Sequence, residues 1–208
     1  MHIVDGALSN EVVIAAAVLA VGGIALGLRK LPMEKIPVAG VLSATFFVAS
    51  LIHVPIGPSS VHLILSGLAG LVLGWAAFPA LFVGLLLQSV FFGFGGVTVL
   101  GVNTLNIALP AVAVFYLCRY GIASKSDVAA AIWGGFGGAL AIALTAVMVA
   151  VSLALSGEEF IPAAKLVLVT HVPVIVIEGL LTGFAVYLTR KVKPELFAEI
   201  SSPAGGVR

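Results

Sequence analysis

The first residues of the chain could bind a transition metal ion. The sequence begins MHIVDG, which places a histidine at position 2. The α-amine of Met1, the amide nitrogen of His2 and Nδ1 of His2 can bind one ion together, because they close two small chelate rings. A fourth nitrogen would complete the square plane that Ni(II) and Cu(II) prefer. The metal must displace the amide proton of His2, so binding is expected to depend on pH.

A histidine near a chain terminus is also common as an ordinary polar residue of a tail. The rest of the chain must decide between the two interpretations. Of its 208 residues, 61% are hydrophobic and 9% are charged, whereas about a quarter are charged in a typical soluble domain. Long apolar runs between short polar segments predict an all-α integral membrane protein. The net charge of +1 argues against a nucleic-acid partner, and the single cysteine, Cys118, excludes an internal disulfide.

The apolar runs predict a bundle of about seven transmembrane helices. The predicted spans are residues 12–28, 36–54, 61–75, 76–92, 104–120, 128–155 and 161–188. The third is short for a bilayer, which takes roughly 20 residues to cross, and only the uncharged sequence WAAFP separates it from the fourth. The first run follows a polar, acidic start, so it is expected to be retained as a span and not cleaved as a signal peptide.

A single transmembrane domain is therefore predicted for residues 1–208. It comprises a metal-chelating N-terminal segment at 1–11, a helical bundle at 12–188 and a cytoplasmic tail at 189–208. Basic residues orient this bundle, because they favour the cytoplasmic side. With the N-terminus outside and the C-terminus cytoplasmic, the residues on the inner side are Arg29, Lys30, Lys35, Arg119, Lys125, Arg190, Lys191, Lys193 and Arg208. Lys165 is the one basic residue expected near the outer face of the cell (inner) membrane.

In this orientation all four histidines of the chain lie at or near the outer face. His2 is in the tail, His53 ends the second span, His62 begins the third and His171 lies early in the last. Chance could gather four residues in this way. A histidine in a membrane protein is costly, however, unless it is paired or binds a metal. A shared outer site is the better interpretation.

Several separated segments of the sequence resemble one protein family. They are MHIVDG at the start, PSSVHLILSGLAGLVLGW in the middle, LLLQSVFFGFGGVTVLGVNTLNIA after it and HVPVIVIEGLLTGFAV near the end. The sequence resembles the CbiM/NikM family over the stretch from Met1 to about Leu188. Its members are the substrate-binding membrane components of energy-coupling factor (ECF) transporters for nickel and cobalt.

The resemblance implies where the metal binds. The N-terminus would insert from the outer side into a pocket between the helices and form a nearly planar site of four nitrogens. Three nitrogens would come from Met1 and His2, and the fourth from the histidine of the VHL segment, which is His62. The terminus would then have to be exported, free and unextended.

Other polar residues could line this pocket. Asp5 could anchor the inserted tail, or form a turn with Gly6. The resemblance implies that Asn103 and Asn106 line the pocket and orient the terminal segment. Asn103 could equally cap a helix, so Asn106, expected inside the helix, is the better pocket candidate.

Ser60 lies close to the predicted fourth ligand. With its neighbour Ser59, it could bond the second nitrogen of His62, although capping of the third helix is the favoured alternative. His171 could act as a gate or a transient ligand, and is the fifth supporting candidate.

Glu178 is the carboxylate predicted deep inside a span. It lies seven residues after His171, so both should project from one face of the last span, about 10 Å apart in height. An ionisable residue at this depth is a candidate functional group. A hydrogen bond within the bundle, with Gln88 as a candidate partner, explains Glu178 equally well, and this structural role is preferred.

The leading function is capture of Ni²⁺ or Co²⁺ for uptake, with the ion as the transported substrate and no resident cofactor. The sequence has no phosphate-binding loop of the GxxxxGKS/T kind, so it is expected to be no enzyme and to depend on ATPases supplied by other subunits. The resemblance implies a transmembrane coupling subunit, cytoplasmic ATPase subunits and a small accessory membrane subunit as partners within the lipid bilayer.

Three alternatives stay open. The protein could be a cobalt-specific component linked to cobalamin synthesis, because Co(II) lies just below Ni(II) in the affinity series. A membrane-embedded metalloenzyme is a second alternative, against which the sequence has no HExxH pattern and no Glu beside the histidines. A secondary transporter is a third, but no clear inverted repeat or chain of intramembrane carboxylates is found.

Overall fold

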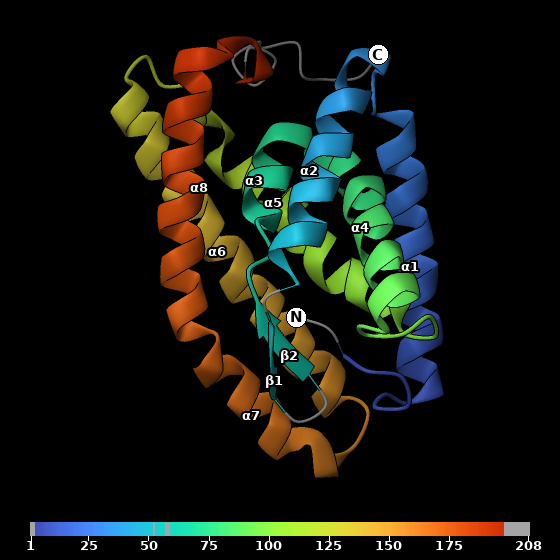
Figure 1. The fold of residues 1–208 in the computed structure, drawn as a ribbon. Helices are drawn as coiled ribbons and strands as arrows, with labels where there is room; N and C mark the ends of the chain where they lie inside the picture. The colour runs from blue at the N-terminus through green and yellow to red at the C-terminus, as the bar shows by residue number, and fades with distance from the viewer. Residues whose placement is uncertain (1–2, 52, 57–58, 198–208) are drawn as a thin grey trace.

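The computed structural model describes residues 3–197, apart from residue 52 and residues 57–58 (Figure 1). Within these ranges the chain forms eight α-helices and one antiparallel pair of strands. The helices are α1 (Asn10–Arg29), α2 (Ile36–Ala49), α3 (Ser66–Leu73), α4 (Ala77–Phe92), α5 (Leu100–Ile122), α6 (Asp127–Ala154), α7 (Ile161–Thr170) and α8 (Val172–Val192). The strands are β1 (His53–Ile56) and β2 (Ser59–His62). Short 3₁₀ turns lie at Met33–Lys35, Gly74–Ala76, Glu158–Phe160 and Pro194–Phe197.

The helices are those of a multi-pass membrane protein. Five helical stretches are long and apolar enough to cross a membrane: Asn10–Arg29, Ser66–Phe92, Leu100–Ile122, Asp127–Ala154 and Val172–Val192. This confirms the prediction of a helical membrane protein. It does not reproduce the predicted count of about seven full-length spans. With 14 residues, α2 is shorter than the roughly 20 that cross a bilayer, as is α7 with 10.

The stretch Ser66–Phe92 contains a reversal of the chain. Gly74 has φ of 56°, a left-handed conformation that ends α3 and is easiest for glycine. In Figure 1, α3 and α4 leave this turn side by side. The backbone of Gly70 in α3 lies against Ala111 of α5, whereas Phe78 in α4 lies against Gly23 of α1. The boundary predicted at WAAFP is therefore confirmed to within two residues.

A strand pair replaces the predicted junction of the second and third spans. Helix α2 ends at Ala49, not at residue 54, and α3 begins only at Ser66. Between them β1 and β2 pair with His53 opposite His62. The sequence HVPIGPSS explains the difference, because its two prolines and its glycine oppose a continuous helix.

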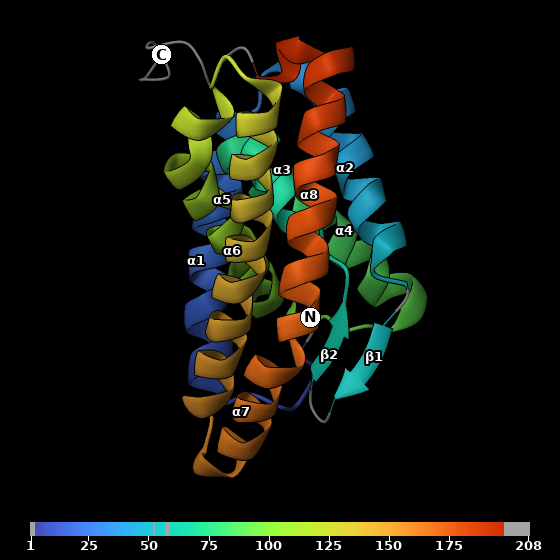
Figure 2. The ribbon, with the colours of Figure 1, turned by 90° about the vertical axis from the view of Figure 1, so that its left-hand side faces the viewer.

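The last predicted span, residues 161–188, is two helices and not one. Helix α7 ends at Thr170, and α8 begins at Val172 with a proline in its first turn. Pro173 has no N–H to donate to the carbonyl four residues earlier, and its ring opposes continuation of α7. The residue at this break is His171. The break lets α7 diverge from α8 at the lower end of the molecule (Figure 2).

The two ends of the bundle differ in charge and regularity. Residues 3–9, the strand pair, the loop at 93–99 and α7 gather at one end, which we call the hairpin end (Figure 1). The opposite end, which we call the basic end, carries every lysine and arginine of the described part of the chain except Lys165. There Arg190 of α8 forms an ion pair of 3.0 Å with Asp127 and donates to the carbonyl of Ile122 at 2.5 Å.

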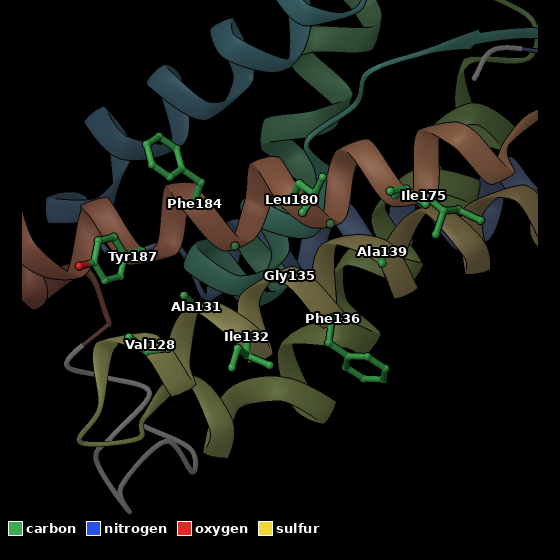
Figure 3. A pocket seen from close by; sticks show the side chains of 13 residues that line it. Val128, Ala131, Ile132, Gly135, Phe136, Ala139, Ile175, Leu180, Phe184 and Tyr187 are labelled. Carbon is green, nitrogen blue, oxygen red and sulfur yellow. The ribbon is translucent and has the colours of Figure 1, made fainter.

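Helices α6 and α8 pack with their backbones in close approach. A Cβ on Gly135 would lie 3.0 Å from the carbonyl oxygen of Gly179, and a Cβ on Gly179 would lie 3.1 Å from that of Gly135. Small residues permit such an approach between membrane helices. On the outside of the pair runs a groove whose lining is almost wholly apolar, with Phe136, Leu180 and Phe184 at its edge (Figure 3). The residues that line this groove include no His, Cys, Asp or Glu.

Candidate metal site

The N-terminal segment enters the bundle at the hairpin end. Ile3 is fully buried. Its N–H donates to Oδ1 of Asn103 at 2.9 Å, and its carbonyl accepts from Nδ2 of the same side chain at 3.1 Å. Asn103 lies in the first turn of α5 and is itself buried. A single amide side chain thus satisfies both backbone groups of Ile3, much as a neighbouring strand would.

Asp5 ties the same segment to the loop that precedes α5. Its backbone N–H donates to the carbonyl of Gly95 at 2.8 Å, and its carboxylate accepts from Oγ1 of Thr98 at 2.5 Å. Gly96 has φ of 119°, and a Cβ there would lie 2.1 Å from the carboxylate carbon of Asp5. A side chain at Gly96 would be strained and would displace Asp5. Asp5 thus ties the segment to this loop, and it also forms a turn with Gly6, closed by the N–H of Ala7 donating to the carbonyl of Val4 at 3.3 Å. The two interpretations are compatible, and a role of Asp5 in a metal site stays a prediction.

His62 ends strand β2 and is buried. Its Nδ1 lies 2.8 Å from the carbonyl oxygen of Leu63. A carbonyl oxygen only accepts, so Nδ1 carries a proton, and in the neutral imidazole the lone pair is then on Nε2. This is the tautomer that a metal-binding histidine needs, with one nitrogen fixed by a backbone carbonyl and the other able to coordinate.

Glu178 of α8 binds the backbone just after His62. Its carboxylate accepts from the N–H of Ile64 through Oε1, and from the N–H of Leu65 at 2.9 Å through Oε1 and 3.0 Å through Oε2. Leu65 precedes α3 with φ of 55°, which is unusual for a leucine. The carboxylate therefore holds the junction of β2 and α3. Gln88 is buried in α4, and the described residues provide its side chain with no hydrogen-bond partner.

His171 is the other buried histidine of the described chain. Its Nδ1 donates to the carbonyl of Val167 at 2.5 Å, and its Nε2 is buried without a hydrogen bond to any described residue. His171 lies just before the apolar stretch Val172–Val192. Burial lowers its pKa to about 4, so the imidazole is neutral near pH 7. It too carries its lone pair on Nε2.

The two asparagines of α5 have different surroundings. The N-cap position of α5 is Val99, so the capping role considered for Asn103 is wrong. Asn106 exchanges hydrogen bonds of 3.2 Å and 3.3 Å with Oγ of Ser152 in α6. It joins two helices, and it is Asn103 that holds the N-terminal segment.

The capping role favoured for Ser59 and Ser60 is also wrong. Both lie in β2, and α3 begins only at Ser66. Their side chains lie outside the described part of the structure, as do Met1 and His2 altogether and the side chain of His53. Among the residues that are described, no three His, Cys, Asp or Glu side chains form a group that could hold a metal ion. The predicted ligands from Met1 and His2 are thus not placed.

The sequence analysis did not identify the partners of Asp5 and of Glu178. The carboxylate of Asp5 accepts from Thr98 and lies where a side chain on Gly96 would be, and the carboxylate of Glu178 accepts from the N–H groups of Ile64 and Leu65. For the loop, the glycine-rich sequence FGFGGVTVL was a usable signal, because closely spaced glycines mark places where backbone and side chains approach closely. For Glu178, its depth in an apolar run was a signal, but its partners are backbone groups more than a hundred residues away.

Comparisons with known proteins agree with this architecture. A protein of Haemophilus influenzae named for metal transport is 43% identical over 203 residues, covering 94% of this chain and 96% of that protein. A fused nickel transport protein, NikMN, of Rhodobacter capsulatus is 36% identical over 158 residues, covering 70% of this chain and 46% of that protein.

A crystal structure of a transition metal transporter superposes with a TM-score of 0.76 at 26% identity, covering 99% of this chain and 100% of that one. The family described as "Cobalt uptake substrate-specific transmembrane region", CbiM, matches residues 2–196. With nearly the whole chain matched, this protein belongs to the CbiM family.

Proposed function

We propose that the protein is the substrate-binding component of an ATP-driven ECF-type uptake transporter for Ni²⁺ or Co²⁺. It would capture the ion at the outer face with its N-terminal residues. The family is described by cobalt uptake, and relatives carry names of nickel transport proteins. The observation that carries the proposal is the pairing of Asn103 with both backbone groups of buried Ile3.

Simple geometry connects this pairing to the proposal that nitrogens at the N-terminus bind the metal. The Cα atoms of adjacent residues are about 3.8 Å apart, so fixing Ile3 inside the bundle restricts His2 to its immediate surroundings. Asp5 restrains the segment a second time at the 93–99 loop. Holding a chelating segment before the metal arrives reduces the ordering cost of binding. The α-amine of Met1 and two nitrogens of His2 would supply three ligands.

The fourth ligand in this proposal is Nε2 of His62. His62 is buried, and its Nδ1–H donates to the carbonyl of Leu63. In the neutral ring the lone pair is then on Nε2, as in metal-binding histidines. His171 has the same tautomer and is the competing candidate. Asp5, Ser60, Asn103, Asn106 and His171 are the proposed supporting residues, among which Asn103 and Asp5 have contacts that suit the role.

Charge and the relatives support the orientation and the partners of this proposal. The basic end would face the cytoplasm, because lysine and arginine favour that side, and the hairpin end would face outward. The fused relatives carry further sequence beyond the part that this chain matches, which supports association with another transport subunit. We infer a coupling subunit and ATPase subunits at the cytoplasmic side, with the protein itself performing no catalysis.

The direct test is metal capture by the purified protein in detergent. We expect about one Ni²⁺ or Co²⁺ per chain after exposure to equal concentrations of both ions, measured by elemental analysis after removal of excess metal. A near-planar set of four nitrogens favours nickel over cobalt. Uptake in cells should require coexpressed ATPase subunits. A protein that retains neither ion, or uptake that persists without ATPases, would contradict the proposal.

A further inference from the structure

Glu178 and His62 bind opposite ends of one peptide group. The Leu63–Ile64 peptide presents its carbonyl oxygen to Nδ1–H of His62 at 2.8 Å. The same peptide presents its N–H, on Ile64, to Oε1 of Glu178. The order is carboxylate, peptide, imidazole, so a negative charge on α8 is connected to the histidine through two hydrogen bonds.

Such a chain polarises the peptide it contains. A carboxylate at the N–H draws that proton toward itself and makes the carbonyl at the other end a stronger acceptor. A stronger acceptor at Nδ1–H fixes the imidazole ring and makes Nε2 a better electron donor. Metal-binding histidines in many proteins obtain the same effect from a carboxylate or carbonyl bonded directly to the second nitrogen.

The surroundings hold Glu178 firmly enough for this role. The residue is fully buried, and α8 is fixed against α6 by the close approach of Gly135 and Gly179. The carboxylate also accepts from Leu65, at the start of the eight-residue helix α3. Unpaired N–H groups at a helix start favour a negative charge.

We propose that Glu178 is a positioning residue for the metal ligand His62, acting through the Leu63–Ile64 peptide. The proposal rests on the proposed function, in which His62 binds the ion. It reverses the sequence-based preference for a purely structural role of Glu178. An amide in place of the carboxylate keeps one acceptor oxygen but turns an NH₂ group toward backbone donors, and it removes the charge.

The test is Ni²⁺ affinity of the full chain purified in detergent, by titration calorimetry with a competing chelator. We expect Glu178→Gln to bind about 10- to 100-fold more weakly, the usual loss when the outer partner of a ligand is removed. Thr182→Val is the matched control, since Thr182 is a buried polar residue one turn further along α8 whose hydroxyl has no partner among the described residues. Its affinity should equal that of the parent.

A double-mutant cycle separates positioning from general support of the fold. If Glu178 acts through His62, then Glu178→Gln should cost nothing further in a His62→Ala background. The visible absorption of bound Ni²⁺ should move in Glu178→Gln toward that of His62→Ala, and stay unchanged in Thr182→Val. Equal losses in both backgrounds, or parent-like affinity and spectrum, would overturn the proposal.

Two further outcomes are informative. If Glu178→Gln does not yield monodisperse protein, Glu178→Asp tests the same claim, because it keeps the charge but shortens the reach. Its affinity should fall below that of the parent, and parent-like affinity would overturn the proposal. If the parent itself binds neither Ni²⁺ nor Co²⁺, the proposed function fails first, and the role of Glu178 fails with it.

Discussion

The hairpin end and the helical body satisfy their buried polar groups in different ways. In the body, Thr145 donates to a carbonyl four residues earlier in its own helix, at 2.8 Å. At the hairpin end, Asn103 and Glu178 bind backbone groups 100 or more residues away. The local bond completes a helix that would form without it. The distant bonds help to fix segments that lie outside the helices.

The difference indicates where specificity for a ligand is built. Regular helices form the frame, packed through glycine and joined by a few polar contacts such as that of Asn106 with Ser152. Asn103 of α5 holds the segment around Ile3, and Glu178 of α8 holds the segment that follows His62. Changes at the hairpin end should therefore alter metal binding, and changes in the body should alter stability.

The largest effect on metal binding is expected for His2→Ala. The substitution removes the imidazole nitrogen and the chelate ring that it closes with the amide. Ni²⁺ capture should be lost to below detection in elemental analysis of the purified protein. If the variant still binds one nickel ion per chain, His2 is not a ligand and the proposed set of terminal ligands is wrong.

A smaller but strong effect is expected for His62→Ala, which leaves the three nitrogens of Met1 and His2. Losing a group that supports a ligand typically lowers metal affinity about 10- to 100-fold. Losing the ligand His62 itself should lower Ni²⁺ affinity further, as measured by competition with a chelator. His171→Ala is the matched variant, because His171 is equally buried with the same tautomer. If His171→Ala loses binding while His62→Ala keeps it, the fourth ligand is His171.

Asn103→Ala should produce an intermediate effect. It leaves both backbone groups of buried Ile3 without their partner, which costs about 1–3 kcal/mol for an unsatisfied group, and it frees the chelating segment. We expect Ni²⁺ affinity to fall at least about tenfold, within the range for loss of a supporting partner. Asn106→Ala breaks a comparable pair with Ser152. It should lower the thermal stability in detergent but leave the affinity unchanged.

The smallest effect on metal binding is expected in the body, for Gly134→Ala. A Cβ there would lie 2.7 Å from a methyl group of Val186, so α6 and α8 must move apart. Overpacking of this kind costs about 1–3 kcal/mol and should lower the midpoint of thermal unfolding. Metal affinity in the folded protein should match the parent. A large loss of affinity would show that body and site are not separable as described.

Apolar runs predicted much of the frame, and local chemistry explains where they failed. Runs of the right length located the five stretches able to span, and the uncharged segment WAAFP located the reversal between α3 and α4. The strand pair and the break at His171 were overlooked, because hydropathy continues through both. The prolines at 55 and 173 carried the missing information.

The contacts around the candidate site were not predictable from the sequence, and its metal ligands stay a prediction. The positions of Asp5, His62 and Asn103 pointed to one region, partly through the family resemblance. Which asparagine meets the terminal segment depends on the rotation of α5, and the partner of Glu178 depends on how β2 joins α3. Both are set by tertiary packing, which leaves no periodic pattern in the sequence.

The most direct test of the account is a change at the terminus that leaves every side chain intact. An uncleaved Gly-Ser extension ahead of Met1 converts the α-amine into an amide, whose nitrogen no longer offers a lone pair near neutral pH. The matched control adds the same residues after Arg208. Ni²⁺ affinity of both proteins would be measured by calorimetry after verifying monodispersity and N-terminal mass. We expect the N-terminal extension to eliminate high-affinity binding and the C-terminal one to leave it unchanged. Parent-like affinity in the extended protein would contradict the terminal ligand.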